Sequence, residues 1–176
     1  LKRIRLLMEV EEGYKDTKIG WVPKDWEVFS MGDILKILTD YTANGSFASL
    51  KENVTVYDEP NYALWIMGRS LKSGDFVDKI RYTDKRGYDF LSKSKLYGGE
   101  LLMPKTGSVG EAYILPDLNR KATLADNVFL LVPKENIAKL FLFQYINSSV
   151  FKKELNRLMY GSSQQTIVKK SLRKIK

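Results

Sequence analysis

Three short apolar runs between residues 97 and 132 constrain the fold of this chain more than any other feature of its sequence. They are Leu101–Met103, Ala112–Leu115 and Asn127–Val132, and a proline follows each of them at once. Short apolar runs bounded by glycine and proline are typical of β-strands, because both residues interrupt regular structure. The stretch therefore predicts three strands of a sheet.

The polar loop Lys105–Gly110 joins the first two runs and holds Gly107 and Gly110 three residues apart. This spacing lets the backbone take positive φ and approach a ligand or another strand closely. A Walker-type phosphate loop is excluded, because here the lysine precedes the glycines and a strand follows. Two interpretations stay open. The backbone amides, with Lys105, Thr106 and Ser108, contact a nucleic-acid phosphate, or the loop is a plain β-turn.

Segments before this stretch predict a mixture of elements. Ser30 and Asp33 have the spacing of a capping box, which predicts a helix that runs on through Leu38. The glycine-flanked segment Gly68–Asp75 predicts a polar loop. Alternation of apolar and polar residues over Phe76–Tyr82 predicts a half-buried strand.

The N-terminal part predicts a helix and a linker, which we set apart as residues 1–17. Apolar side chains over residues 2–10 fall on roughly one side of a helix, and a polar stretch leads from Gly13 to Thr17. Trp21 and Trp26 then stand on either side of Pro23. Such large side chains are expected to anchor the start of the next domain on its core.

After Pro133 the apolar period changes to that of helices. Residues 137–145 and 150–160 predict two helices, and Ser148 and Ser149 are suited to cap the second. Strands in the middle with helices at both ends indicate an α+β fold. We expect a mixed or antiparallel sheet core with twisted β-hairpins, flanking helices and a C-terminal helical part.

Composition excludes several kinds of chemistry. The 176 residues include neither histidine nor cysteine, which excludes imidazole or thiolate metal sites and catalysis by Ser-His or Cys-His pairs. The net charge is +8, and it divides as −3 over residues 1–60, +4 over 61–151 and +7 over 152–176. A basic chain favours a polyanionic partner, most commonly a nucleic-acid backbone. No run is long enough to span a bilayer and no signal peptide is visible, so we expect no membrane partner and a cytoplasmic location.

Several segments together resemble the target-recognition domain of the specificity subunit of type I restriction–modification enzymes. The resemblance begins at IGWVPKDWEV and MGDILKIL, continues through Gly74-Asp75, and is strongest at SKSKLYGGELLMPKTGSVGEAYIL. It ends at LFQYINSS and GSSQQTIVKKSLRKIK, so it covers most of residues 18–176. Glu100 departs from the aspartate that is common in the family, which is a mild chemical change.

The resemblance implies a non-catalytic protein without a cofactor of its own. Such subunits choose the double-stranded DNA sequence for a complex that also holds methyltransferase and endonuclease subunits. A full-length member has two recognition domains, each of which reads half of a split site, separated by helical spacers. We therefore expect residues 18–168 to form one recognition domain and residues 169–176 to begin a connection to a spacer helix. Pairing with a second recognition domain or with a second copy both stay open.

Two other functions stay open at this point. The chain could be the DNA-reading part of a fused restriction–methylation polypeptide, or a protein-interaction module that uses Tyr57, Tyr62 and Trp65. For the DNA-reading function, side chains that donate to phosphates or base edges are the candidates. They are Arg69, Lys72, Lys79, Arg81, Lys93, Lys95, Lys105, Ser108, Ser162, Ser163 and Gln164.

Overall fold

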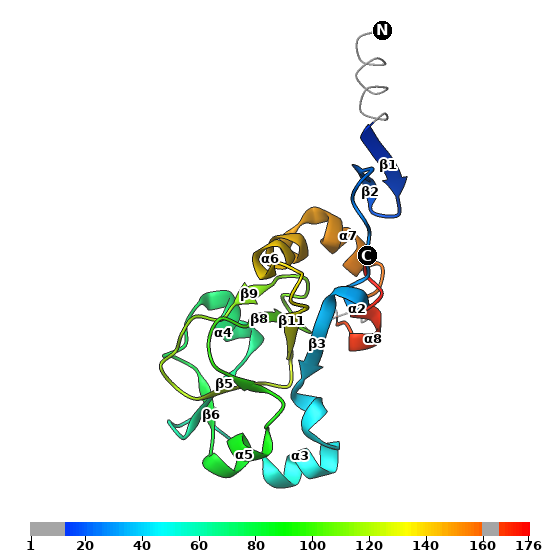
Figure 1. Cartoon of the computed structure of the whole chain (residues 1–176). Helices are drawn as coiled ribbons and strands as arrows, with labels where there is room; N and C mark the ends of the chain where they lie inside the picture. The colour runs from blue at the N-terminus through cyan, green and yellow to red at the C-terminus, as the bar shows by residue number, and fades with distance from the viewer. Residues whose placement is uncertain (1–12, 160–165) are drawn as a thin grey trace.

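The computed structural model describes residues 13–159 and 166–176, which form a four-stranded and a five-stranded sheet with helices around them and a separate two-stranded hairpin (Figure 1). The first sheet has four strands in the order β3–β11–β8–β9, and all its pairs are antiparallel. Its strands are β3 (Leu35–Asp40), β8 (Leu101–Pro104), β9 (Tyr113–Ile114) and β11 (Val128–Pro133). The three strands predicted between residues 97 and 132 are thus neighbours in one sheet.

This four-stranded sheet is buried on both faces, because successive side chains of a strand point to opposite sides. Leu101 and Met103 of β8 join one core cluster with Phe129 of β11. Leu102 of β8 and Leu130 of β11 point the other way, into a second cluster. The sheet therefore lies between a helical layer and the second sheet.

The second sheet has five strands in the order β4–β6–β5–β10–β7. One pair, β5 with β10, is parallel and the others are antiparallel. The strands are β4 (Val56–Tyr57), β5 (Ala63–Ile66), β6 (Arg81–Thr83), β7 (Lys95–Leu96) and β10 (Ala122–Leu124). A third core cluster beneath this sheet contains Trp65 and Leu50. The predicted α+β class with a mixed sheet core is confirmed.

Helices at both ends of the chain cover the outer face of the first sheet. Ser148 caps the second of the two predicted C-terminal helices by accepting from the Phe151 amide. The C-terminal residues pack into the same core: the amide of Met31 donates to the Ile175 carbonyl at 2.7 Å, and Leu172 is fully buried. The domain boundaries at residues 17 and 168 stay predictions. The helices are α2 (Met31–Ile34), α6 (Lys139–Asn147), α7 (Ser149–Asn156) and α8 (Lys169–Leu172).

Two sequence-based predictions are wrong about where helix and strand change. The capping box of Ser30 and Asp33 is present, but its helix ends at Ile34 and residues 35–40 form β3. Pairing with β11 overrides the weak helical preference of this segment. The strand predicted over Phe76–Tyr82 starts only at Arg81, as β6. The Asp75 side chain accepts from the amides of residues 77 and 78 and turns the chain before it.

One segment that was expected to be a loop is helical, and a further short helix follows β6. The predicted polar loop contains α4 (Gly68–Ser73), which ends at Gly74 in a left-handed conformation. Asp84 caps α5 (Lys85–Phe90) by accepting from the Gly87 amide at 2.7 Å. The remaining elements of this half are the 3₁₀ turn η1 (Tyr41–Asn44) and α3 (Phe47–Asn53). The helix predicted over residues 2–10 lies outside the described residues.

The first hairpin, β1 (Tyr14–Thr17) and β2 (Gly20–Pro23), projects from the body of the domain beside the C-terminal end (Figure 1). Trp21 and Trp26 are each 53% exposed, so the expectation that they anchor on the core is wrong. Val22 between them is the buried residue of this segment. Trp26 instead lines a shallow apolar groove with Phe29 and Phe141.

Replacement of each loop glycine by alanine separates backbone strain from packing. Gly107 and Gly110 both have positive φ, at 75° and 82°. A Cβ at position 107 would meet open space, whereas at position 110 it would lie 2.4 Å from Cδ2 of the buried Leu155. We expect Gly107→Ala to cost about 1–2 kcal/mol from the backbone alone. We expect Gly110→Ala to cost a further 1–3 kcal/mol or so from overpacking. Urea unfolding measures both, and equal costs would contradict the packing of this loop on α7.

Candidate nucleic-acid interface

The loop Lys105–Gly110 lies beside the segment that follows residue 165. Thr106 and Thr166 form an isolated antiparallel bridge. The hydroxyl of Thr166 donates to the carbonyl oxygen of Lys105 at 3.1 Å, and the Ile167 amide donates to the same oxygen at 3.3 Å. The two stretches predicted to contact DNA therefore meet at these ends, although Ser162, Ser163 and Gln164 themselves lie outside the described residues.

A buried carboxylate ties this meeting point to the sheet. Asp40, the last residue of β3, is directly paired with Phe129 and so lies on the helix-covered face. One of its oxygens accepts from the ammonium of Lys105 at 3.1 Å, and the other accepts from the ammonium of Lys169 at 2.7 Å. The side chain of Asp40 is 6% exposed, against 16% for Lys105 and 31% for Lys169.

Opposing influences act on the pKa of Asp40. Burial raises it, whereas hydrogen bonds from Lys169, Thr42 and Lys105 and the charge of Lys105 lower it. The donors prevail, so the pKa lies below the ordinary value of 3.8. Asp40 is therefore ionised at neutral pH, and the ion pairs with both lysines are intact.

An open cleft of about 490 Å³ surrounds these groups. The ends of β3 and β8, the start of β11 and residues 166–169 form its walls. Thr106, Asn127 and Thr166 add hydrogen-bonding groups, and the exposed Asp126 adds a second carboxylate. The two lysines and two aspartates that line the cleft balance, so these residues carry no net formal charge.

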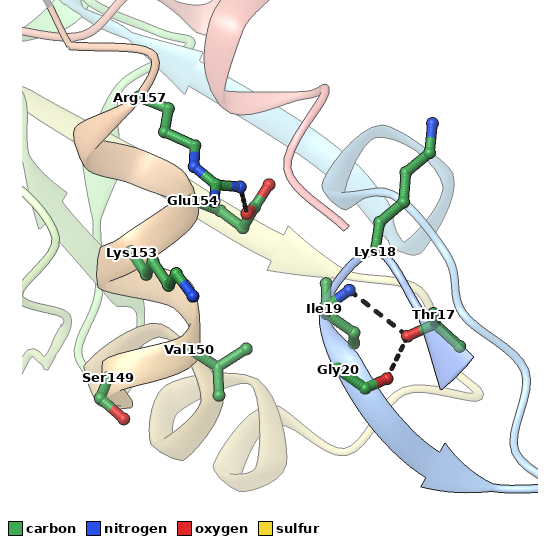
Figure 2. Close-up of a pocket in the computed structure, with 9 residues that line it drawn as sticks. All are labelled: Thr17, Lys18, Ile19, Gly20, Ser149, Val150, Lys153, Glu154 and Arg157. Carbon is green, nitrogen blue, oxygen red and sulfur yellow. Dashed lines mark hydrogen bonds and ion pairs between the residues drawn. The ribbon is translucent and has the colours of Figure 1, made fainter. Parts of the chain in front are cut away.

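A second, more basic cleft separates the hairpin β1–β2 from α7 (Figure 2). It has a volume of about 430 Å³, and its charged lining residues are Lys18, Lys153, Arg157 and Glu154. Figure 2 shows the guanidinium of Arg157 turned onto Glu154, with which it forms an ion pair. The remaining excess charge comes from Lys153, whose ammonium points toward the hairpin, and from Lys18, whose side chain extends away from α7 (Figure 2).

The structure places the other predicted contact residues in two further groups, on strands of the second sheet and on the helix and loops next to them. In the first group, Arg69 donates to the Lys79 carbonyl at 2.8 Å, and Arg81 pairs with Asp58 at 2.7 Å. The pKa of Asp58 is lowered by the hydrogen bond and charge of Arg81 and by the charge of Arg69, so these cations lie near one another. Lys72 is exposed on α4.

The second group contains Lys93 and Lys95. The ammonium of Lys95 lies 4.5 Å from the ring centroid of Tyr88, and the Lys93 amide donates to Asn44 at 2.9 Å. Arg81 of β6 pairs with Trp65 of β5. In the same row across the sheet, Trp65 pairs with Thr123 of β10, and Thr123 pairs with Lys95 of β7. Three strand spacings therefore separate Arg81 from Lys95, about 14 Å. The predicted residues form three groups rather than one patch.

Sequence reasoning missed several members of these groups. Asp40 was not selected, because an acidic residue at the end of an apolar segment carries no signal of a partner 129 positions away. Lys121 donates to the Tyr62 hydroxyl at 2.7 Å. It joins the group of Lys95, because both ammonium groups lie over the ring of Tyr88. No local pattern marks Lys121, because no aromatic residue lies within five positions of it in the sequence. Ser108 is half-buried, and its carbonyl accepts from the Glu111 amide.

The described residues define a class of protein: an α+β domain that presents polar loops at the end of a doubly buried sheet. Among residues 13–159 and 166–176, no group of three or more Asp or Glu side chains is placed to hold a metal ion. Within the same ranges no helix is long and apolar enough to cross a membrane.

Residues 23–176 match the family model described as the type I restriction modification DNA specificity domain, and the chain belongs to this family. Two curated relatives come from Methanocaldococcus jannaschii. The type I restriction enzyme MjaVIII specificity subunit is 29% identical over 173 residues, which covers 89% of this chain and 36% of the relative. The putative MjaX specificity subunit is 26% identical over 161 residues, which covers 87% and 36%. The chain thus spans just over a third of the length of these relatives.

Solved structures support the fold. The HsdS subunit of Thermoanaerobacter tengcongensis matches 99% of this chain and 38% of its own, with a TM-score of 0.59 and 16% identity. A chain from a structure that addresses complex assembly and conformational transition of the type I R-M system matches equally well, with the same TM-score and identity and 39% of its own chain covered.

The dependence of folding stability on acidic pH tests the ion pairs of Asp40. Because its pKa is lower in the folded state, its stabilising contribution is fully present above the unfolded value and is lost as pH falls through the folded value. We expect the free energy of unfolding to fall more steeply below about pH 4 in the wild type than in Asp40→Asn. Urea unfolding at a series of pH values measures this, and parallel curves would contradict the ion pairs.

Proposed function

We propose that this domain reads one half of a bipartite DNA sequence for a type I restriction–modification complex and catalyses no reaction itself. The family match over residues 23–176 carries the proposal. Two curated relatives are named specificity subunits, which favours the same role here. We infer that methyltransferase and endonuclease subunits supply the chemistry, and that the complex works on double-stranded DNA in the cytoplasm.

The geometry supports two kinds of DNA contact, one with the phosphate backbone and one with base edges. Basic side chains on several elements, with a net charge of +8 over the chain, attract the phosphate backbone without regard to sequence. Sequence is read by donors and acceptors that are held at fixed places against base edges. The loop Lys105–Gly110 and Thr166 lie side by side and offer such groups.

Binding to DNA should depend steeply on salt. If about six phosphates are contacted, affinity should fall roughly a thousandfold between about 50 and 200 mM salt, because each contact releases condensed counterions. Fluorescence anisotropy of the 176-residue chain with a labelled duplex measures this. Binding that does not change with salt would contradict recognition of the DNA backbone.

Selection from a library of random duplexes should return one uninterrupted half-site. The physical reason is that a single domain offers one set of base-reading groups, and each well-placed pair discriminates by about 1–3 kcal/mol. Sequencing of the bound fraction after several rounds measures the preference. A bound fraction as random as the input would contradict sequence reading while leaving general DNA affinity possible.

A further inference from the structure

Asp40 joins three segments that are far apart in the sequence. It ends β3, and its partners Lys105 and Lys169 lie 65 and 129 positions away along the chain. Lys105 begins the loop that follows β8, and Lys169 begins α8 just after Thr166. The carboxylate therefore fixes the start of the loop Lys105–Gly110 and the start of α8 relative to the same sheet.

Stability alone explains this arrangement poorly. Burial of a carboxylate and of two ammonium groups removes much of their hydration, and well-packed apolar residues commonly stabilise a core as well or better. What an ion cluster adds is direction, because each ammonium must meet a particular oxygen. The hydroxyl of Thr42, which donates to Asp40 at 2.7 Å, further fixes the orientation of the carboxylate.

We propose that Asp40 is a positioning residue for sequence recognition: through Lys105 and Lys169 it holds the loop 105–110 and residues 166–169 at the spacing needed to read bases. This inference rests on the proposed function. Asp40 itself touches no DNA in this account, since its side chain is 6% exposed. Its effect is on preference among sequences rather than on general attraction to DNA.

The charge in the cleft distinguishes this role from a phosphate site. Asp40 and Asp126 together offset the charges of Lys105 and Lys169. A phosphate would therefore find no excess positive charge among these lining residues. Hydrogen-bonding side chains held in place in a cleft without net charge are instead suited to directional hydrogen bonds with base edges.

Removal of the Asp40 carboxylate should affect DNA affinity in opposite directions, depending on whether its charge or its positioning role matters more. Asp40→Asn raises the net charge from +8 to +9, which by itself tightens binding to every duplex. If Asp40 positions the two segments, binding to the selected half-site should instead weaken about tenfold, the equivalent of one charged hydrogen bond. Binding to unrelated duplexes should stay the same or tighten, so the ratio of the two affinities falls.

Glu52→Gln is the control, because it removes the same charge at an exposed position on α3, outside the cleft. It should tighten binding to both duplexes alike and keep the ratio. Anisotropy titrations of both variants against the selected and an unrelated duplex give the ratios, and urea unfolding confirms that each variant is folded. A ratio that is unchanged in Asp40→Asn would overturn the inference.

A second pair of variants keeps the inference testable if Asp40→Asn does not fold. Lys169→Gln breaks one of the two ties at a position that is 31% exposed, and it should lower the affinity ratio. Lys170→Gln removes the same charge from the exposed neighbouring position on α8, and it should weaken binding to all duplexes while the ratio is kept. Identical ratios in the two variants would refute the role of the tie. Absence of any preferred duplex for the wild type would instead refute the proposed function.

Discussion

Burial of the four-stranded sheet on both faces is the constraint on which the rest of the structure depends. Strands β8 and β11 place alternate side chains in two different core clusters, so neither strand can shift without disturbing both. The strands are short, yet packing on two sides fixes their register. Loops that leave their ends therefore start from a rigid frame, which is what precise hydrogen bonding to a partner requires.

Asp40 extends this frame from apolar packing to a polar anchor. Its pairing with Phe129 places the carboxylate at the end of the sheet, where the ammonium of Lys105 lies 5.4 Å from the centroid of the Phe129 ring. Hydrogen bonds are electrostatically stronger where water is largely displaced. The chain thus holds its loops by a few directed contacts. In the proposed function, basic side chains elsewhere attract the DNA backbone without regard to sequence.

The sequence predicted the parts of this fold that local rules determine. Glycine and proline marked the strands β8, β9 and β11, and the capping box at Ser30 was present. Predictions failed where tertiary contacts decide. Residues 35–40 fit a helix or a strand until β11 is available as a partner. The ion pair of Asp40 with Lys169 cannot be found from spacing, since 129 positions separate the two residues.

The most direct test of DNA reading is to map amide chemical shifts of the chain as a selected duplex is added. We expect the largest changes on the loop Thr106–Gly110 and on Thr166, which Asp40 holds together through Lys105 and Lys169. Changes confined to the apolar groove around Trp26 and Phe141, with those two segments unaffected, would contradict this expectation.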